Sequence, residues 1–479
     1  MAQANSTTKG VLWSAVDRFG VVLLQFVINL VLARLLTPND FGMVGMILIF
    51  VVVSQTLIDG GFASALIQKL NPSQTDYSTI FWWNIAFSAI LYSIIYIFAP
   101  NIATFFHLPE LSPLLRVIGV VIIINSFALV QKTKLRKSLS FKKIAITDIV
   151  SYTGAALIAF YLAHKGYGAW SLVAMQISNA LLGALIFWCT SKWSPSWEFS
   201  FSSLKSLFSY GGYLLIANMM QDVCTHIQGV VIGRKFSAAN TGLYTQAKKM
   251  DEVASMTIPA VFCQVLFPVY SEHQNNLNQL CELLRKNTRL IAFIVFPLMM
   301  LLIIVAEPIF NLLYGEKWLE AVPYFQILCI GGFCSAVYNL NYYAVAAVGK
   351  SKALFYWGCY KWGMLIVLLL VGASFNMTAV LFAMVISNIN IYLTNALLAQ
   401  HYIKYNLSTQ IKDVTPTFIC TLATGVIVYL ITLYTSLHWI IISTLFVVLY
   451  LAICYLFKIQ AIVESKDIVT LFIRKFAKR

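Results

Sequence analysis

VLARLLTPNDFG, residues 31–42, is followed much later in the chain by a similar stretch, VIGRKFSAANTG, residues 231–242. In each copy an apolar run ends at an arginine, Arg34 or Arg234, and a polar turn follows. The next apolar run then begins, and each copy closes on a glycine at the same spacing. A charged hinge that occurs twice with the same residue spacing indicates an internal duplication.

Two further pairs of segments support the duplication. FAPNIATFF (98–106) resembles VAEPIFNLL (305–313), and AMQISN (174–179) recurs as AMVISN (383–388). The three matched pairs keep their order along the chain, as expected for a duplicated unit with small insertions. The hinge is therefore predicted to join the first two helices of each copy.

The composition is that of a membrane protein. The chain has 479 residues, of which 60% are apolar and 11% charged, and its mean hydropathy is +0.79. A soluble chain carries about 25% charged residues, so this one has too little polar surface to cover a water-facing globule. Apolar runs long enough to cross a ~30 Å hydrocarbon layer recur along it. Strand-like alternation is absent, so we predict an all-α polytopic membrane protein.

Turn signals and charge clusters divide the chain into fourteen candidate transmembrane helices. Their approximate cores are 11–33, 41–67, 79–100, 112–131, 143–163, 168–190, 207–233, 241–270, 288–313, 321–348, 353–373, 376–400, 414–435 and 438–457. The net charge of +15 fits this map. With a cytoplasmic N-terminus, most of the 33 lysines and arginines fall on inner segments, as the positive-inside rule requires. Both termini are then cytoplasmic.

The repeat and the span map together predict four regions. A six-helix lobe covers 1–200, a second six-helix lobe covers 201–405, two added helices cover 406–460, and a basic amphipathic tail covers 461–479. Because six is even, the two lobes enter the membrane in the same direction and are related by a pseudo-two-fold axis along its normal. Such an arrangement suits alternating access to a central cleft. The tail is expected to lie on the inner membrane surface.

Polar side chains form a narrow stripe on two predicted helices. In the first helix Arg18, Gln25 and Asn29 fall within about 60° of one another at 100° per residue. In the seventh helix Asn218 and Asp222 belong to a similar stripe. Such stripes serve either helix packing or the lining of a cavity. Packing rarely requires an arginine, so Arg18, Gln25, Asn29 and Asp222 are candidate substrate-binding residues.

Four further bases stand inside predicted spans: Arg116, Lys248, Lys249 and Lys361. A charge there costs roughly 2.5–3.5 kcal/mol on insertion scales and usually faces the bundle interior or a water-filled cavity. Lys361 lies closest to the middle of its span. Arg116 could instead snorkel to the outer surface, and the two neighbouring lysines could pair with adjacent carboxylates. An excess of bases favours an anionic substrate, such as one that carries phosphate.

Asp17, Asp59 and Asp222 are the candidate ion-coupling carboxylates. Asp59 stands in IDGGFASALIQK (58–69), where the paired glycines could instead support a kink or close packing. No His, Cys or carboxylate set has metal-ligand spacing, and the nine cysteines form no CxxC pair. No nucleophile stands near a base at recognisable spacing. The sequence therefore predicts no metal, no cofactor and no enzyme activity.

Several longer motifs carry a resemblance to a known family. They are LARLLTPNDFGMV, LIDGGFASALIQK, FAPNIATFFHLPELSPLLR, LSFKKIA, GYGAWSLV, KWSPSWEFSFSSLKSLFSYG, VLFPVYSE and LLYGEKWLEAVPYFQIL. In this order, from about residue 10 to about residue 400, they resemble the Wzx/WzxC-type polysaccharide flippases of the multidrug/oligosaccharidyl-lipid/polysaccharide exporter superfamily.

The resemblance implies two six-helix lobes in a V with two extra C-terminal helices. It also implies the transfer of undecaprenyl-diphosphate-linked oligosaccharide repeat units across the bacterial inner membrane, driven by Na⁺ or H⁺, with polysaccharide polymerase machinery as a possible partner. Arg18 and Asp222 are similar in position to cavity-facing charges of such flippases. Relatives carry an arginine where Gln246 stands here, and the nearby Lys248 and Lys249 are expected to substitute for it.

Two other classes of protein fit the sequence less well than a flippase. A multidrug and toxic compound exporter of the same superfamily would favour carboxylates in the cleft, because its substrates are cationic. A membrane polymerase or ligase would need a sizeable outer loop with catalytic groups, whereas the predicted loops are short. The sequence leaves the sugar repeat unit, the coupling ion and the oligomeric state open.

Overall fold

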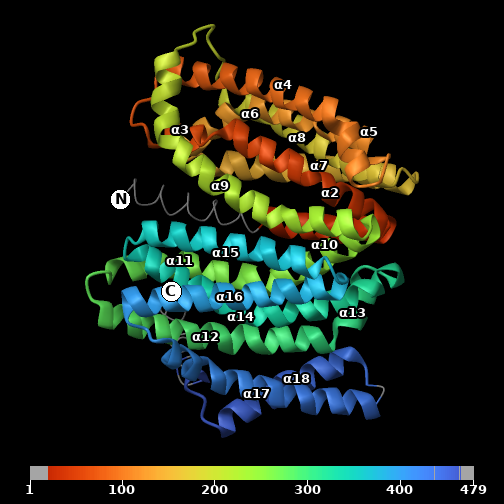
Figure 1. Cartoon of the computed structure of the whole chain (residues 1–479), viewed down its shortest axis with the longest axis vertical. Helices are drawn as coiled ribbons and strands as arrows, with labels where there is room; N and C mark the ends of the chain where they lie inside the picture. Colours follow the sequence, from red (N-terminus) through yellow and green to blue (C-terminus); the bar gives the residue numbers. More distant parts are fainter. Residues whose placement is uncertain (1–19, 436, 463, 465–479) are drawn as a thin grey trace. The chain divides into compact units, whose positions relative to one another are not determined.

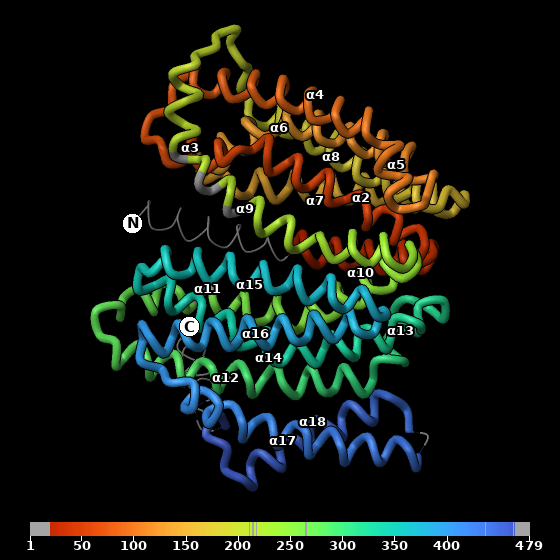
Figure 2. Tube along the Cα trace, viewed as in Figure 1, coloured from red at the N-terminus to blue at the C-terminus, as the bar shows by residue number. Residues whose placement is uncertain are grey.

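The computed structural model describes residues 20–435, 437–462 and 464, and Figures 1 and 2 show its helices and their course. Within these residues every regular element is a helix, and no strand is present. The predicted all-α membrane fold is confirmed. Arg18 and Asp17 lie outside the described residues, as does nearly all of the predicted tail.

The helices follow one another with short connections. After an initial helix, Gly20–Leu35, the chain forms α2 (Pro38–Asp59), α3 (Phe62–Gln68), α4 (Gln74–Phe105), α5 (Leu111–Ile118), α6 (Val120–Lys137), α7 (Phe141–His164), α8 (Ala169–Ser191), α9 (Phe201–Lys235) and α10 (Ala238–Glu252). A π-helical turn, η1 (Val253–Thr257), leads to α11 (Ile258–Glu272), α12 (Leu277–Ile304), α13 (Ala306–Leu313), η2 (Glu316–Ala321), α14 (Val322–Ala347), α15 (Ser351–Gly372), α16 (Met377–Ile403), α17 (Leu407–Tyr434) and α18 (Trp439–Leu456).

Twelve segments of the described chain are long and apolar enough to cross a membrane. The helix Gly20–Leu35 is shorter within the described residues, and α9, the expected seventh span, is not among the twelve. The count of fourteen spans therefore stays a prediction, while the multi-pass character of the chain is established.

The chain divides into two compact units, with the boundary between Gly242 and Leu243. Helix α9 packs on α2, α3 and α4 and so belongs to the first unit. It is nevertheless the first helix of the predicted second copy. The boundary between the two compact units therefore lies later in the chain than the predicted boundary between the two sequence copies. The predicted lobe limits at 200 and 405 stay predictions.

The repeated hinge has the same local structure in both copies. Thr37 caps α2: its hydroxyl accepts from the N–H of Asp40, whose carboxylate accepts from the N–H of Thr37 at 2.9 Å. In the second copy the hydroxyl of Ser237 accepts from the N–H of Asn240 at 3.1 Å. Each turn thus satisfies one of the free N–H groups at the beginning of a helix.

The two hinges also pack against each other inside the first unit. A Cβ atom on Gly42 would overlap the carbonyl oxygen of Ala238, and one on Gly242 would overlap the carbonyl oxygen of Pro38. The contact is reciprocal, with each glycine against the first turn of the other helix. Glycine is required at both positions because nothing larger than hydrogen fits there.

A connecting segment between α8 and α9 is fixed on the start of α4. The indole N–H of Trp193 donates to the Gln74 side chain at 2.7 Å, and Trp82 donates to the carbonyl of Ser196 at 2.9 Å. Trp193 is buried in a cluster with Tyr77 and other aromatic residues. This cluster packs the connecting segment against the beginning of α4 in the first unit.

In the second unit a buried ion network joins the end of the chain to α12. Asp413, on α17, pairs with Arg285 at 2.9 Å and with Arg289 at 3.0 Å, and accepts from the hydroxyl of Tyr405 at 2.9 Å. Arg289 also pairs with Glu464 at 2.5 Å. The network therefore holds α17 and the segment after α18 on α12.

Candidate functional site

Lys361 stands near the middle of α15, half-buried in the second unit. Its Nζ atom lies 3.3 Å from the amide oxygen of Asn395 on α16 and 5.5 Å from the centre of the Tyr342 ring on α14. The Asn395 amide N–H donates in turn to the carbonyl of Tyr338 at 3.1 Å. Three packed helices therefore position this ammonium group.

No carboxylate accompanies Lys361 on these helices. The sequence has no aspartate or glutamate between Glu320 and Asp413, so α14, α15 and α16 carry none. Among the residues that the structure describes, Lys361 has no ion-pair partner. An amide oxygen and a ring face stabilise a cation only partly, so the site retains attraction for an anion.

Sequence reasoning missed the neutral side chains around this lysine. The hydroxyl of Tyr360 donates to the amide oxygen of Asn390 at 3.3 Å, while the Asn390 amide nitrogen is buried and, within the described chain, has no hydrogen-bond partner. The available signal was SNINIYLTN (387–395), which places three asparagines in one apolar helix. Polar residues in such a helix usually face other helices or a cavity.

Lys248 and Lys249 lie near the end of α10, Lys249 in its last turn. The Nζ atom of Lys248 is 3.7 Å from the Glu252 carboxylate and 5.9 Å from the centre of the Tyr244 ring. The local ion pair considered from the sequence is therefore formed at Lys248. Lys249 is exposed, and Gln246 is fully buried. Helix α14 reaches this region through Tyr338, whose hydroxyl contacts the sulfur of Met256 at 3.6 Å.

Two predicted carboxylates of the first unit have local partners. The Asp222 carboxylate lies 2.5 Å from the hydroxyl of Thr56, which joins α9 to α2. Asp59 ends α2 and accepts the N–H of Ala63 at 3.2 Å across the break formed by Gly60 and Gly61. Both glycines adopt positive φ, 53° and 73°. The structure thus supplies a kink at Asp59, and its coupling role stays a prediction.

The remaining site candidates are spread over the first unit. Gln25 and Asn29 are half-buried on the initial helix, and within the described chain the buried amide oxygen of Asn29 has no partner. Arg116, on α5, donates to the backbone carbonyl of Tyr96 at 3.2 Å, and its guanidinium carbon lies 4.5 Å from the centre of the Tyr96 ring. Arg116 is thereby held by α4, and its role in binding substrate stays a prediction.

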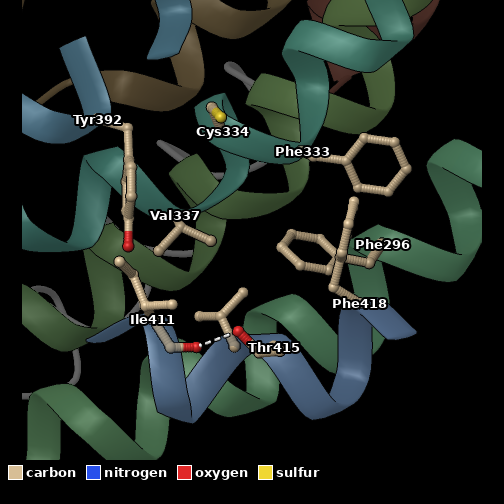
Figure 3. A pocket seen from close by; sticks show the side chains of 9 residues that line it. Phe296, Phe333, Cys334, Val337, Tyr392, Ile411, Thr415 and Phe418 are labelled. Atoms are coloured by element: carbon tan, nitrogen blue, oxygen red, sulfur yellow. Dashed lines mark hydrogen bonds between the residues drawn. The ribbon is translucent and has the colours of Figure 1, made fainter. Parts of the chain in front are cut away.

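An apolar pocket of about 190 Å³ also belongs to the second unit. Figure 3 shows the rings of Phe296, Phe333 and Phe418 on one side and Tyr392 on the other. The hydroxyl of Thr415 donates to the carbonyl of Ile411 at 2.7 Å and so offers the pocket no free donor. Such a lining suits hydrocarbon.

Comparison with solved structures defines the class of fold. The lipid II flippase MurJ, in its inward closed conformation, superposes with a TM-score of 0.78 at 16% identity, covering 93% of this chain and 98% of that one. An inward-facing multidrug resistance transporter of the MATE family gives a TM-score of 0.62 at 15% identity, covering 81% and 98%. The fold is that of the multidrug/oligosaccharidyl-lipid/polysaccharide exporters.

The sequence comparisons identify the family. Residues 31–323 match the model of the family described as polysaccharide biosynthesis protein, and the chain belongs to that family. The teichuronic acid biosynthesis protein TuaB of Bacillus subtilis is 28% identical over 441 residues, 89% of each chain. The lipopolysaccharide biosynthesis protein WzxC of Escherichia coli is 24% identical over 341 residues, 71% of this chain and 69% of that one. The resemblance recognised in the sequence is confirmed.

Proposed function

We propose that the chain is a flippase that moves lipid-linked oligosaccharide repeat units across the bacterial inner membrane for the synthesis of a surface polysaccharide. The substrate is an oligosaccharide on a polyprenyl diphosphate, with undecaprenyl as the expected chain. The protein acts as a transporter by alternating access and breaks no covalent bond, so it is not an enzyme.

One observation carries the proposal. Lys361 is a half-buried cation in the middle of a membrane helix, surrounded by neutral groups of Asn395 and Tyr342. Keeping an ammonium group there is costly unless something compensates its charge. A diphosphate supplies that charge and several acceptor oxygens. The apolar pocket lined by Phe296 and Phe418 supports a substrate that also carries hydrocarbon.

The relatives point the same way. They include a succinoglycan biosynthesis transport protein of Rhizobium meliloti and a putative O-antigen transporter of Shigella flexneri. An exporter of cationic drugs is the alternative, and it is weaker. A cationic drug would be repelled by Lys361, and α14, α15 and α16 offer no carboxylate to attract it.

The proposal also covers the orientation of the chain, its coupling ion, its other substrate-binding residues and its partner. Both termini lie in the cytoplasm, because the basic segments then face inward. Transport is coupled to Na⁺ or H⁺, with Asp17, Asp59 and Asp222 as the candidates raised by the sequence. The further candidates for substrate binding, beside Lys361, are those raised by the sequence: Arg18, Gln25, Asn29, Arg116, Lys248 and Lys249. A polysaccharide polymerase takes up the product on the outer side.

Flipping can be measured in proteoliposomes with a polyprenyl-diphosphate oligosaccharide that carries a dithionite-sensitive fluorophore. Lys361→Ala is expected to slow the initial rate about ten- to hundredfold, since a hydrogen bond to a charged group contributes about 1.5–3 kcal/mol. Lys361→Arg keeps the charge and is expected to retain most of the rate. Lys352→Ala removes an exposed lysine of the same helix and serves as the control.

Two results would contradict the proposal. One is an unchanged rate in Lys361→Ala, because the unpaired cation would then contribute nothing to the substrate path. The other is a wild-type protein that leaves the labelled lipid on one leaflet but exports a cationic dye from loaded vesicles. That result would favour the multidrug exporter.

A further inference from the structure

The connecting segment between α8 and α9, residues 192–200, is not helical, and its backbone is bonded to side chains of α4. The N–H of Ser196 donates to the hydroxyl of Ser78 at 2.9 Å, and the N–H of Ser200 donates to that of Thr79 at 3.0 Å. Non-helical backbone beside a membrane helix needs such partners, because hydrocarbon offers none. The polar start of α4 therefore fixes this segment on the outside of a membrane-spanning helix.

The end of this segment carries exposed aromatic side chains. Trp197 is 90% exposed, and Phe199 and Phe201 are each more than half exposed. The ring of Trp197 stacks on that of Trp82, with 4.6 Å between the ring centres. Exposed apolar groups that lie together on a surface mark a contact with a membrane or with a partner.

The length of α4 places Trp82 and Trp197 near the edge of the hydrocarbon layer. With 32 residues, α4 is about 48 Å long and exceeds a ~30 Å hydrocarbon core by about 18 Å, or about 9 Å at each end. Trp82 is the ninth residue of α4 and lies roughly 12 Å from its start. Tryptophan is enriched at this level of membrane proteins. The exposed aromatic residues therefore face the boundary between lipid headgroups and acyl chains.

Lys134, near the end of α6, is a cation without an anionic partner at the same end of the unit. Its Nζ atom lies 5.3 Å from the centre of the Tyr77 ring and 5.6 Å from the centre of the Trp193 ring. Two ring faces position an ammonium group but leave its hydrogen-bond donors unused. Within the described residues Lys134 forms no ion pair, whereas Lys132, on the same helix, pairs with Asp148 at 2.9 Å. Lys134 is therefore positioned for an acceptor from outside the chain.

The level of Lys134 differs from that of the exposed aromatic residues. Tyr77 is five residues nearer to the start of α4 than Trp82, which is about 7 Å along the helix. The ammonium group beside Tyr77 therefore stands at the level of lipid headgroups, and Trp197 stands deeper. A phospholipid presents its phosphate and its glycerol backbone in the same order.

The surrounding helix ends carry a surplus of positive charge. Residues 66–80, 130–148 and 188–208 contain nine lysines or arginines and three carboxylates. The carboxylates already have partners, which are Lys69 for Asp76, Lys132 for Asp148 and the hydroxyl of Thr75 for Glu198. Basic groups at the end of membrane helices attract anionic lipid.

We propose that this end of the first unit binds an anionic phospholipid of the surrounding bilayer, with its phosphate on Lys134 and its glycerol backbone near Trp197. The ammonium group donates to the phosphate oxygens, and such charge-assisted hydrogen bonds are strong. One ammonium group suits the single negative charge of a phosphodiester. Phosphatidylcholine binds more weakly, because it carries its own cation. In the proposed orientation of the chain, the lipid belongs to the inner leaflet.

Native mass spectrometry counts the lipids bound to the full-length protein in neutral detergent. Lys134→Ala is expected to weaken the tightest binding step of dioleoyl phosphatidylglycerol about fivefold, the effect of one lysine near a lipid surface. Its binding of dioleoyl phosphatidylcholine should not change, which a general loss of structure would not leave intact. Lys134→Arg keeps the charge and should bind both lipids as the wild type does.

Two further variants separate the parts of the site. Lys143→Ala is the matched control, because it removes an exposed lysine at the same end of the unit and should bind phosphatidylglycerol as the wild type does. Trp197→Ala is expected to weaken both lipids equally, since the indole distinguishes no headgroup charge. None of these measurements involves transport, so they decide on the lipid site even if the proposed flippase activity fails.

Three results would overturn the inference. The first is an unchanged affinity of Lys134→Ala for phosphatidylglycerol. The second is an equal loss in Lys143→Ala and Lys134→Ala, because the charge of the whole surface, and not this position, would then hold the lipid. The third is a tighter binding of geranylgeranyl diphosphate than of phosphatidylglycerol, with the larger loss in Lys134→Ala, since Lys134 would then serve the substrate.

Discussion

Replacing Gly42 with alanine tests whether the repeated hinges pack against each other. The new Cβ atom would overlap the carbonyl oxygen of Ala238. This oxygen belongs to the backbone, so no side-chain rotation can relieve the overlap. One of the two helix ends must shift, and the reciprocal contact of Gly242 with Pro38 would be disturbed as well.

The magnitude follows from two opposing effects. The substitution of glycine by alanine in a helix interior stabilises the folded protein by roughly 0.5–1 kcal/mol when the methyl group meets no obstacle. Overpacking costs about 1–3 kcal/mol, and a rigid backbone neighbour favours the upper end. We expect a net destabilisation of about 2 kcal/mol, which lowers the melting temperature of the purified protein by roughly 4–8 °C at about 2–4 °C per kcal/mol.

Gly358→Ala is the matched control for this prediction. Gly358 is also helical, on α15, and a Cβ atom there would meet nothing within 4 Å. The control is expected to melt at or slightly above the wild-type temperature. If Gly42→Ala also melts within about 1 °C of the wild type, a change worth less than about 1 kcal/mol, the crossing of the two hinges is not as close as the structure shows.

The same melting measurement checks two further predictions. Trp193→Ala should lower the free energy of unfolding by about 3–5 kcal/mol, because the indole is 5% exposed and its N–H is bonded to Gln74. Its control, Trp197→Ala, removes a side chain that is 90% exposed and should change that free energy by less than about 1 kcal/mol. Equal effects of the two substitutions would show that the aromatic cluster does not stabilise the first unit. Asp413→Asn should cost about 3 kcal/mol, since it leaves buried Arg289 short of a negative charge. Its control, Glu282→Gln, weakens an exposed pair and should cost under about 1 kcal/mol; a stable Asp413→Asn variant would mean that the ion network does not hold α17 in place.

Part of the candidate site was accessible from the sequence. Lys361 stands out as a charge in the middle of an apolar run, and the lipid environment makes that position costly in any fold. Its partner Asn395 could not be assigned, because the two residues come from different helices and their meeting depends on how those helices pack. The local pairing of Lys248 with Glu252 was open to prediction, since residues four apart share a helix face.

The sequence by itself determined that the chain is helical, that it crosses the membrane many times and that a hinge is duplicated. Lipid offers no hydrogen-bond partners, so an apolar run must close its own backbone bonds as a helix, and this can be read without knowing any neighbour. Tertiary structure alone decided what the hinge is for. Gly42 meets Ala238 because two helix ends cross within one unit, and a turn motif contains no information about the surface it will face. The same holds for Lys134, which lies over rings from two other segments of the chain, Tyr77 on α4 and Trp193 after α8.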